Sequence, residues 1–409
     1  ISPLAFQGAA SLESITLHSI SLQNIRGRID MFTGLSSVRN IWLDGNPELP
    51  GNIFHGLTSL REIRIENMVA HAMVNSSGKF CYSDFQHLFS GLQSLEVVRL
   101  TNSRIQCETL PTLTFSNLSS LKEVHLLETS PLKILPIGFF HDVPVLQTFT
   151  FSEWTIYPYT TQQVTLPPML FTGLNMEVID LSRQYFLNIS RYLFQNLTSL
   201  QSLYMADCLF DEDLDKDIFK GLTNLRELYL TRTSLTQQGL SSLPFSNLKS
   251  LETLSMASVP LDELSPNLFV GAENLSVINL FDCRFSTIQS GTFPELLILN
   301  LSTNAIREIN SSAFLGLRSL TELYLDGNEM SYVPTDLLRP IIHLRVLWLN
   351  NNNLLDLPTT LFHEQPISLR VLRLDHNNLT MLSMGIFSNL TSLTKLSLEN
   401  NKFDCDCHL

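Results

Sequence analysis

The chain has 409 residues, with 39 acidic and 26 basic side chains and a formal net charge of -13 at pH 7. This negative charge argues against nucleic acid as a partner, because binding to phosphates needs a concentrated positive field. No run of 18 apolar residues occurs, so the sequence predicts no membrane span, and the chain does not open like a signal peptide. The chain opens inside a repeat and stops where a cysteine pattern begins, so we expect it to be part of a longer protein.

A short leucine-rich pattern recurs along the chain. Its clearest copies read L-x-x-N-x-apolar, follow one another about every 24 residues, and begin at Leu301, Leu325, Leu349, Leu374 and Leu398. A unit this short cannot bury an apolar face alone, so it must stack on its neighbours. We therefore predict an α/β leucine-rich repeat solenoid, a horseshoe with a parallel β-sheet on its concave face and loops and short helical turns on its convex face.

Taken in chain order, about 16 repeats share one register, each marked by the apolar residue that opens an L-x-x-L-x-L segment. The register residues are Leu12, Val38, Leu60, Leu95, Leu121, Leu146, Met176, Leu200, Leu225, Leu251, Leu275, Leu296, Leu320, Leu344, Leu369 and Leu393. Side chains in each segment alternate as in a strand, so each repeat should add one strand to the sheet. We place the solenoid at residues 1–403, without an N-terminal cap, and the start of a truncated C-terminal cysteine cap at residues 404–409.

Two repeated positions predict the interior. A phenylalanine occupies the F-x-x-L tail of nearly every repeat, and this fixed place favours a buried spine over a ligand-binding stripe. A recurrent asparagine can pair backbone groups of adjacent turns that would otherwise be buried without partners. The clearest such residues are Asn304, Asn328, Asn352, Asn377 and Asn401. Cys208 and Cys283 occupy the same slot, where we expect free thiols with a packing role.

The remaining cysteines lie outside the strands. Cys81 and Cys107 fall in neighbouring repeats, and we predict a disulfide that joins the unusually long repeat 60–95 to the next one. Cys405 and Cys407 are candidate disulfide residues at the opening of the C-terminal cap.

Asn-x-Ser/Thr sequons predict N-glycosylation and passage through the secretory pathway. The nine candidate sites are Asn75, Asn117, Asn188, Asn196, Asn274, Asn300, Asn310, Asn378 and Asn389. Three of them share one slot of the repeat tail, which a solenoid turns outward. We therefore expect a glycoprotein in the extracellular space or at the cell surface.

Motifs for catalysis, metals and cofactors are not found. The acidic run 211–217 resembles a calcium loop, but Lys216 stands where glycine is needed and Leu222 where a bidentate glutamate is needed. The sequence has no phosphate-binding glycine loop, no H-E-x-x-H and no G-x-S-x-G. We predict no enzyme activity, no metal site and no cofactor.

Candidate ligand-binding residues are the middle residues of the L-x-L segments, which must project from the concave face. Tyr324, Trp348 and Arg373 stand in consecutive repeats with Asp326 and Asp375 beside them. Tyr, Trp and Arg are enriched among the residues that dominate binding energy. The alternative is a purely structural role, in which large side chains cover the sheet and make cation–π contacts with one another.

A second group lies near the other end and combines aromatic with basic side chains: Trp42, Arg64, Arg99 and His125. Such a row could receive an acidic ligand despite the negative total charge. Asn300 projects from the same concave face, so a glycan there would push recognition toward the ends.

The strand motif, the F-x-x-L-x-x-L tails and the ending 400–407 resemble the ectodomains of Toll and Toll-like receptors over essentially the whole chain. The resemblance implies binding of a microbial product or a cytokine-like protein, followed by pairing of two ectodomains as a homodimer or heterodimer. It also implies a membrane helix and a cytoplasmic domain in the parent protein. Adhesion proteins, guidance proteins and variable lymphocyte receptors use the same repeat, so an extracellular adhesion or guidance module stays open as an alternative.

Overall fold

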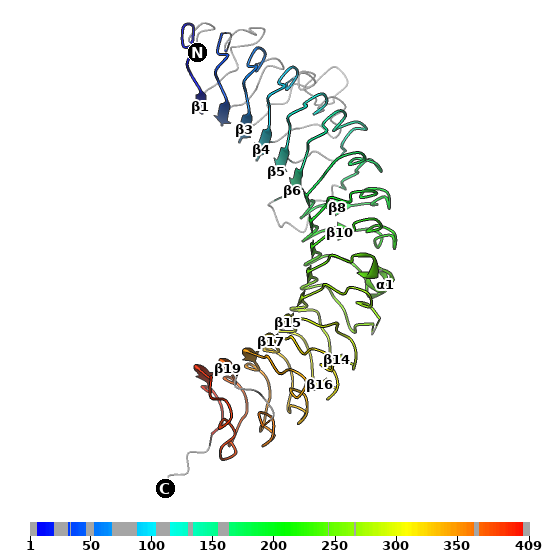
Figure 1. The fold of residues 1–409 in the computed structure, drawn as a ribbon, viewed down its shortest axis with the longest axis vertical. Coiled ribbons are helices and arrows are strands. Elements are labelled where there is room, and N and C mark those ends of the chain that lie inside the picture. Colours follow the sequence, from blue (N-terminus) through cyan, green and yellow to red (C-terminus); the bar gives the residue numbers. More distant parts are fainter. Residues whose placement is uncertain are drawn as a thin grey trace. The chain divides into compact units, whose positions relative to one another are not determined.

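A computed structural model describes residues 6–19, 32, 34–45, 53–67, 88–103, 115–129, 134–153, 163–243, 245–265, 267–363 and 368–403. The chain divides into two compact units, residues 1–222 and 223–409. In each unit, parallel strands line the inner side of a curved stack of turns, and loops form the outer side (Figure 1). The predicted leucine-rich repeat solenoid is confirmed.

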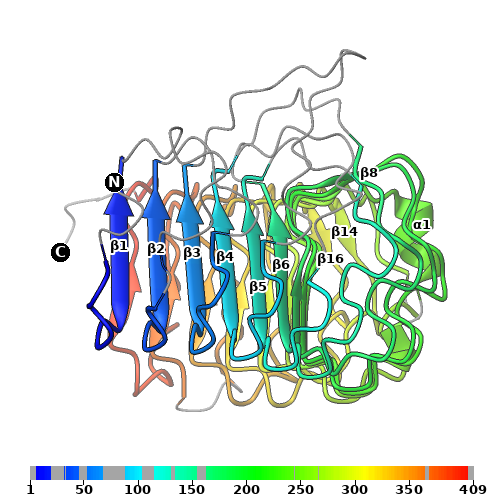
Figure 2. The same ribbon diagram turned by 90° about the horizontal axis from the view of Figure 1, so that it is seen from above.

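The sheet of the first unit follows the chain order of its strands, which lie side by side and point the same way (Figure 2). Its strands among the described residues are β1 (Ser14–His18), β2 (Asn40–Asp44), β3 (Glu62–Glu66), β4 (Val97–Thr101), β5 (Glu123–Leu127), β6 (Thr148–Ser152), β7 (Val178–Asp180) and β9 (Ser202–Tyr204). On the loop side, β8 (Tyr185–Phe186) pairs with β10 (Leu209–Phe210).

The second unit repeats this arrangement with shorter strands. They are β11 (Glu227–Tyr229), β12 (Thr253–Ser255), β13 (Val277–Asn279), β15 (Ile298–Asn300), β17 (Glu322–Tyr324), β18 (Val346–Trp348), β19 (Val371–Arg373) and β20 (Lys395–Ser397). On the loop side, β14 (Thr287–Ile288) pairs with β16 (Glu308–Ile309). One short helix, α1 (Gln237–Ser242), is capped by Thr236, whose hydroxyl accepts from Gly239 N at 3.0 Å, and a 3-10 turn follows at Phe245–Asn247.

Strict alternation explains why these segments become strands with one face inside. In β3, Ile63 and Ile65 are 0% and 1% exposed, whereas Arg64 between them is exposed. Successive side chains of a strand point to opposite faces, so the apolar positions of every turn meet in one core. The predicted inward-facing apolar residues are buried in every described strand of the inner side except β20, where Leu396 is 39% exposed.

The asparagine ladder closes the turns of the second unit. The amide of Asn352 donates to the carbonyls of Leu325 at 2.9 Å and Leu349 at 3.2 Å. Its carbonyl oxygen accepts from Met330 N at 3.2 Å. A buried backbone group without a partner costs about 1–3 kcal/mol, so one side chain that satisfies several of them holds adjacent turns together.

Cysteine replaces asparagine in this slot at two turns. The Cys208 thiol donates to the carbonyl of Leu181 at 3.1 Å, and the Cys283 thiol donates to that of Met256 at 3.2 Å. Burial raises the pKa of both thiols to about 12, so they stay protonated at neutral pH. The prediction of free, buried thiols is confirmed.

The phenylalanine spine is also confirmed. Nearly all of its described members are buried, and neighbouring rings contact one another, as Phe171 and Phe194 do with centroids 6.3 Å apart. Phe6 and Phe387 at the two ends are partly exposed, and Leu338 is buried at the one turn that lacks the ring.

Some predictions fall outside the described residues or stay untested. Cys81, Cys107, Cys405, Cys407 and Asn75 belong to segments that the structure does not describe. The boundaries at residues 403 and 404 stay a prediction. No helix in the described part of the chain is long and apolar enough to cross a membrane.

Candidate ligand-binding surfaces

The predicted residues of the second unit are brought together on its sheet. Tyr324, Trp348 and Arg373 are register partners on β17, β18 and β19, so their side chains form one row on the exposed face. Asp326 and Asp375 lie two residues further along their chains, and alternation turns them to the same face. We call these five residues the C-terminal cluster.

The aromatic and basic members of the C-terminal cluster touch one another. The Tyr324 and Trp348 rings meet edge to face with centroids 4.9 Å apart. The Arg373 guanidinium lies 5.1 Å from the Trp348 ring centre, and its Nε and Nη2 donate to Asp375 at 3.2 and 2.9 Å. Each of the side chains is therefore held in place before any ligand arrives, which lowers the entropy lost on binding.

Asp375 is a buried carboxylate that anchors the cluster. Burial disfavours its ionised form, but the hydrogen bonds from Arg373 and His376 outweigh this effect and lower the pKa of Asp375. His376 Nδ1 lies 3.1 Å from the carboxylate. Because Asp375 is ionised at neutral pH, it holds the Arg373 guanidinium over Trp348.

Two polar atoms beside this anchor are buried and unsatisfied. The Nε1–H of Trp348 and the Oδ1 of Asn350 have no hydrogen-bond partner among the residues that the structure describes, and Asn350 is 2% exposed. By contrast, the Tyr324 hydroxyl donates to Glu322 at 2.5 Å, and burial together with this carboxylate raises the pKa of Tyr324 to about 12. Ser302 donates to Asp326 in the same region.

The second predicted group also forms a row, which we call the N-terminal row. Trp42, Arg64, Arg99 and His125 are successive register partners on β2 to β5. The Arg64 guanidinium lies 4.7 Å from the Trp42 ring centre. His18 meets the other side of the row, with its ring 4.8 Å from that of Trp42.

Carboxylates neutralise the N-terminal row, which the sequence pattern did not reveal. Arg99 donates to Glu62 at 2.7 Å and to Glu123 at 3.0 Å, and His125 also lies 3.1 Å from Glu123. Arg64 pairs with Glu66 on its own strand. The positive field expected for an acidic ligand is therefore cancelled locally. In both groups, the cation–π contacts also match the alternative in which large side chains cover the sheet and contact one another.

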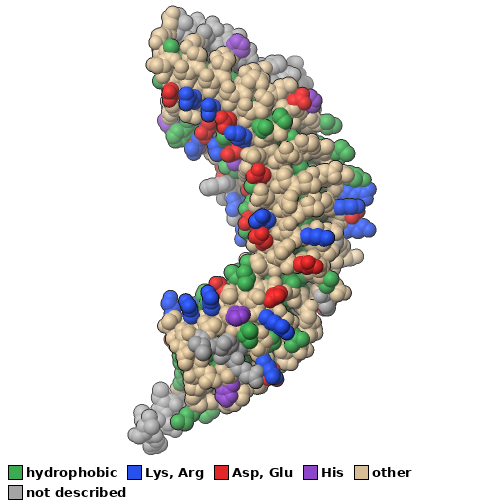
Figure 3. All heavy atoms as spheres, in the orientation of Figure 1, with side chains coloured by type: hydrophobic (Ala, Val, Ile, Leu, Met, Phe, Trp, Pro, Cys, Tyr) green, Lys and Arg blue, Asp and Glu red, His purple; other side chains and the backbone are tan. Residues whose placement is uncertain are grey.

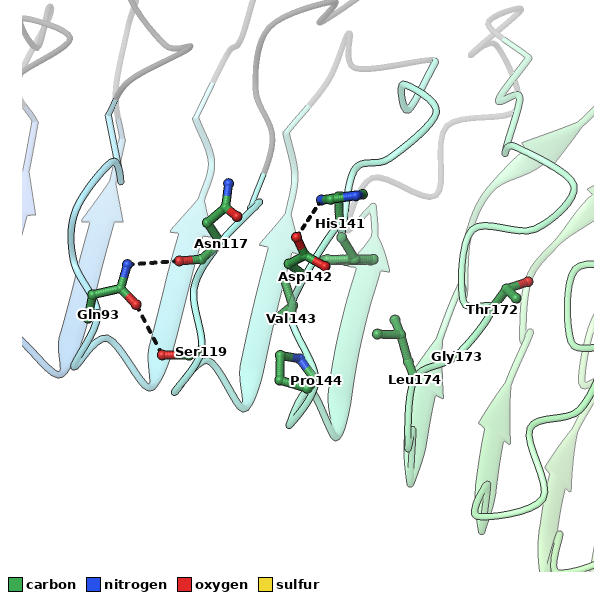
Figure 4. A pocket seen from close by; sticks show the side chains of 11 residues that line it. Gln93, Asn117, Ser119, His141, Asp142, Val143, Pro144, Thr172, Gly173 and Leu174 are labelled. Carbon is green, nitrogen blue, oxygen red and sulfur yellow. Dashed lines mark hydrogen bonds and ion pairs between the residues drawn. The ribbon is translucent and has the colours of Figure 1, made fainter.

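A cavity of about 690 Å³ opens on the flank of the first unit (Figure 4). It is lined by the tails of consecutive turns, and its walls include Gln93, the sequon residues Asn117 and Ser119, and the His141–Asp142 ion pair. Gln93 donates to the Asn117 carbonyl at 3.0 Å and accepts from Ser119 at 3.1 Å. These bonds fix the walls but leave the Asn117 amide facing solvent.

The described sequon asparagines fall into distinct groups. Asn117, Asn188 and Asn196 are exposed, and Asn117 and Asn196 take the left-handed backbone conformation, with φ of 60° and 64°. Asn274 and Asn389 are exposed too, but their amides donate to backbone carbonyls of the preceding turn at 2.6 and 3.1 Å.

The other sequons lie nearer to the sheet or its loops. Asn310 is exposed, and its side chain accepts from Ser312 N at 2.9 Å. Asn378 is half-buried, and Asn300 is half-buried on the sheet face next to Tyr324. Whether any sequon carries a glycan stays a prediction.

Sequence comparison gives the class of the protein. The family described as "Leucine rich repeat" matches residues 273–330 and 342–403, and "BspA type Leucine rich repeat region (6 copies)" matches residues 1–85 and 159–259. Together these matches cover most of the chain. The chain is a leucine-rich repeat protein, and its repeats resemble those of a Toll-like receptor ectodomain.

Curated relatives point in two directions. Human Podocan-like protein 1 is 30% identical over 66% of this chain and 51% of its own length. Toll-like receptor 3 of Boselaphus tragocamelus is 29% identical over 71% of this chain and 36% of its own length, and mouse CD180 antigen is 25% identical over 83% and 50%. The chain thus spans about half or less of these relatives. None of these relatives is named as an enzyme, which agrees with the prediction of no enzyme activity.

Solved structures confirm the fold. A leucine-rich repeat protein of Leptospira interrogans aligns over 95% of this chain and 90% of its own, with a TM-score of 0.69 and 23% identity. Toll, in the Drosophila Toll–Spatzle complex, aligns over 95% of this chain and 51% of its own, with a TM-score of 0.71 and 19% identity.

Proposed function

We propose that the chain is the ligand-binding part of an extracellular, Toll-like innate immune receptor, and that it recognises a microbial product or a cytokine-like protein. The relatives named Toll-like receptor 3 and CD180 antigen support this branch. Ligand binding then promotes pairing of two receptor chains. The membrane attachment and the signalling domain belong to other parts of the parent protein.

One observation carries the choice of surface. The C-terminal cluster presents an aromatic pair and an arginine that is fixed by a buried carboxylate, next to the unsatisfied Trp348 Nε1–H and Asn350 Oδ1. Buried polar groups in folded proteins almost always have partners, so an unsatisfied donor and acceptor beside the aromatic pair favour this part of the sheet as an interface. The Trp42 Nε1–H of the N-terminal row is likewise buried and unsatisfied, but no unsatisfied acceptor lies beside it in the described part of the chain, and the charges of that row are internally paired.

Binding to a panel tests the proposal. The secreted, glycosylated chain is exposed to whole bacteria, purified microbial polymers and host extracellular proteins, in parallel with Trp348→Ala. We expect saturable binding to one panel member and a loss of about tenfold or more in affinity for the variant, as for a residue that dominates an interface.

The matched control is Tyr332→Ala, which removes an aromatic side chain that is 47% exposed on a loop after β17. This control should bind like the unchanged chain. Equal affinity of Trp348→Ala and the unchanged chain would remove the C-terminal cluster from the binding surface.

An extracellular adhesion or guidance module is the second candidate. The match to Podocan-like protein 1 favours it, because that relative is as similar to the chain as Toll-like receptor 3 is. In the same panel, this function predicts binding to host extracellular proteins alone and none to microbial material.

A further inference from the structure

A group of basic side chains at the edge of the second unit is not part of the C-terminal cluster. Arg345 and Arg370 immediately precede β18 and β19, and Lys395 opens β20. Arg370 N donates to the Arg345 carbonyl at 2.8 Å, and Lys395 N donates to the Arg370 carbonyl at 3.0 Å. Three cations therefore stand on three consecutive turns, and we call them the basic strip.

The cations of the basic strip are exposed, and no ion pair or side-chain hydrogen bond joins them to any residue that the structure describes. Glu322 on the neighbouring strand β17 accepts from the Tyr324 hydroxyl instead. Neighbouring strands lie about 5 Å apart, so like charges on adjacent turns repel one another. This repulsion is a cost that nothing described within the unit offsets.

The place that Arg345 and Arg370 take in the repeat, directly before the strand, is charge-balanced elsewhere, whereas Lys395 lies one residue further along its turn. In the first unit, Glu96 lies between Arg61 at 3.3 Å and Lys122 at 2.8 Å. In the second unit, Arg226 meets Glu252 at 3.3 Å on the next turn. The fold thus offers a simple way to pair a cation at this position, and the basic strip lacks it.

The basic strip adjoins the C-terminal cluster. Lys395 is the register partner of Val371, which lies two residues before Arg373 on the same face of β19. Lys and Arg side chains lie next to one another along the inner edge of the second unit (Figure 3). A ligand seated on Trp348 therefore passes the basic strip if it extends toward the edge where the strands begin.

We propose that the basic strip binds a carboxylate-rich segment of a polypeptide ligand, and this inference rests on the proposed function of the C-terminal cluster. The outer cations stand two strand spacings, on the order of 10 Å, apart. An extended acidic segment presents carboxylates on one side about every 7 Å, close enough for flexible Arg and Lys side chains to reach. Guanidinium groups match carboxylates in geometry, and the adjacent Tyr324 and Trp348 suit the apolar side chains of a protein ligand.

An acidic peptide is a suitable probe for the basic strip. The chain has a net charge of -13 and as a whole repels polyanions, so nonspecific binding of such a peptide is disfavoured. We would titrate a fluorescent peptide of alternating Glu and Ser into the full chain at low and at near-physiological salt. Saturable binding that weakens as salt rises is expected. Arg345→Glu with Arg370→Glu should lower the affinity by tenfold or more, and Arg345→Gln with Arg370→Gln should lower it less.

The matched control is Lys249→Glu with Arg284→Glu, which changes the net charge equally at exposed residues outside the basic strip. It should bind the peptide within about twofold of the unchanged chain, allowing for the long-range effect of charge. An equal loss in both charge-reversed chains, or no binding of the peptide, overturns the inference.

Heparin oligosaccharide and inorganic polyphosphate are run as competing probes. Binding of either one without binding of the acidic peptide overturns the assignment to a polypeptide. If the peptide does not bind while the Trp348-dependent ligand of the panel does, the basic strip is rejected and the proposed function stands. If Trp348→Ala has no effect in the panel but the peptide binds through Arg345 and Arg370, peptide binding by the basic strip is supported and ligand binding by the C-terminal cluster is rejected.

Discussion

At the scale of single residues, one slot of the repeat accepts different side chains with different numbers of hydrogen bonds. Asn352 contacts backbone groups on its own turn and on the preceding one, as both donor and acceptor, whereas the Cys208 thiol reaches carbonyls only. The sequence predicted both roles, because the slot recurs at a fixed place after each strand. It did not predict that the thiols, like the asparagine amide, donate to a backbone carbonyl of the preceding turn.

The ladder makes a stability prediction. Replacing Asn352 with Ala leaves the carbonyls of Leu325 and Leu349 and Met330 N without this partner. We expect a loss of about 2–4 kcal/mol in the free energy of unfolding, measured as a lower urea midpoint. Asn352→Cys should lose less. Asn353→Ala, at the exposed neighbour, is the control, and an equal effect there would contradict the role of the ladder.

A half-buried carboxylate in the first unit, Glu153, makes a pH prediction. Burial and the nearby charge of Glu128 raise the pKa of Glu153 from 4.5 to about 7. Between these values the folded chain keeps a proton that the unfolded chain has lost, so Glu153 lowers stability progressively as pH rises from about 4.5 through 7. Glu153→Gln should therefore raise the melting temperature at pH 8 and change it little at pH 4.5. A gain that is the same at both pH values would contradict the raised pKa.

At the scale of elements, a left-handed residue follows most strands of the inner side, either directly or three residues after the strand ends. Gly327, Asn351 and Asn400 are well suited to a φ of 67°, 52° and 57°, but Thr303 adopts 57° with a β-branched side chain. This conformation is strained for threonine, because its Cβ substituents crowd the backbone. The sequence motif contains this turn, but the strain at Thr303 follows only from the backbone angles.

Thr303→Asn tests this strain. We expect a gain of about 1 kcal/mol in the free energy of unfolding, because asparagine adopts the left-handed region more readily. The reciprocal change Asn351→Thr should lower stability by a similar amount. Urea denaturation of both variants measures the two effects, and a loss of stability in Thr303→Asn would show that the turn is not strained.

The sequence predicted the strand rows but not their electrostatics. Trp42, Arg64, Arg99 and His125 form a row because the period is fixed within each strand. The carboxylates that neutralise them stand two residues away along the same strands or on neighbouring strands. The sequence prediction missed these carboxylates because it considered only the middle residue of each L-x-L segment. The basic strip was missed for the same reason, although the signal was present: Arg345 and Arg370 each follow a register leucine directly.

At the scale of the whole molecule, the proposed recognition residues and most of the exposed sequons lie on different kinds of surface. The sheet face of the second unit carries the proposed recognition residues, and the exposed flank of the first unit carries Asn117 and Asn196. Asn300 is the exception, because it is the register partner of Tyr324. A bulky glycan at this position would cover the edge of the C-terminal cluster.

We therefore expect Asn300 to be unmodified in the secreted protein. Peptide mapping by mass spectrometry, before and after enzymatic removal of N-glycans, measures occupancy at each sequon. We expect glycans at Asn117 and Asn196, whose exposed amides make no hydrogen bond with the described residues. Full occupancy at Asn300 would contradict the placement of the ligand next to Tyr324.

The most direct test of the central claim is hydroxyl-radical footprinting of the chain with and without the ligand found in the panel. We expect oxidation of Tyr324 and Trp348 to fall on binding, while Tyr332 and Tyr192, which are exposed outside the sheet rows, stay equally reactive. Protection confined to flank or loop residues, with Tyr324 and Trp348 unchanged, would contradict recognition on the sheet face of the second unit.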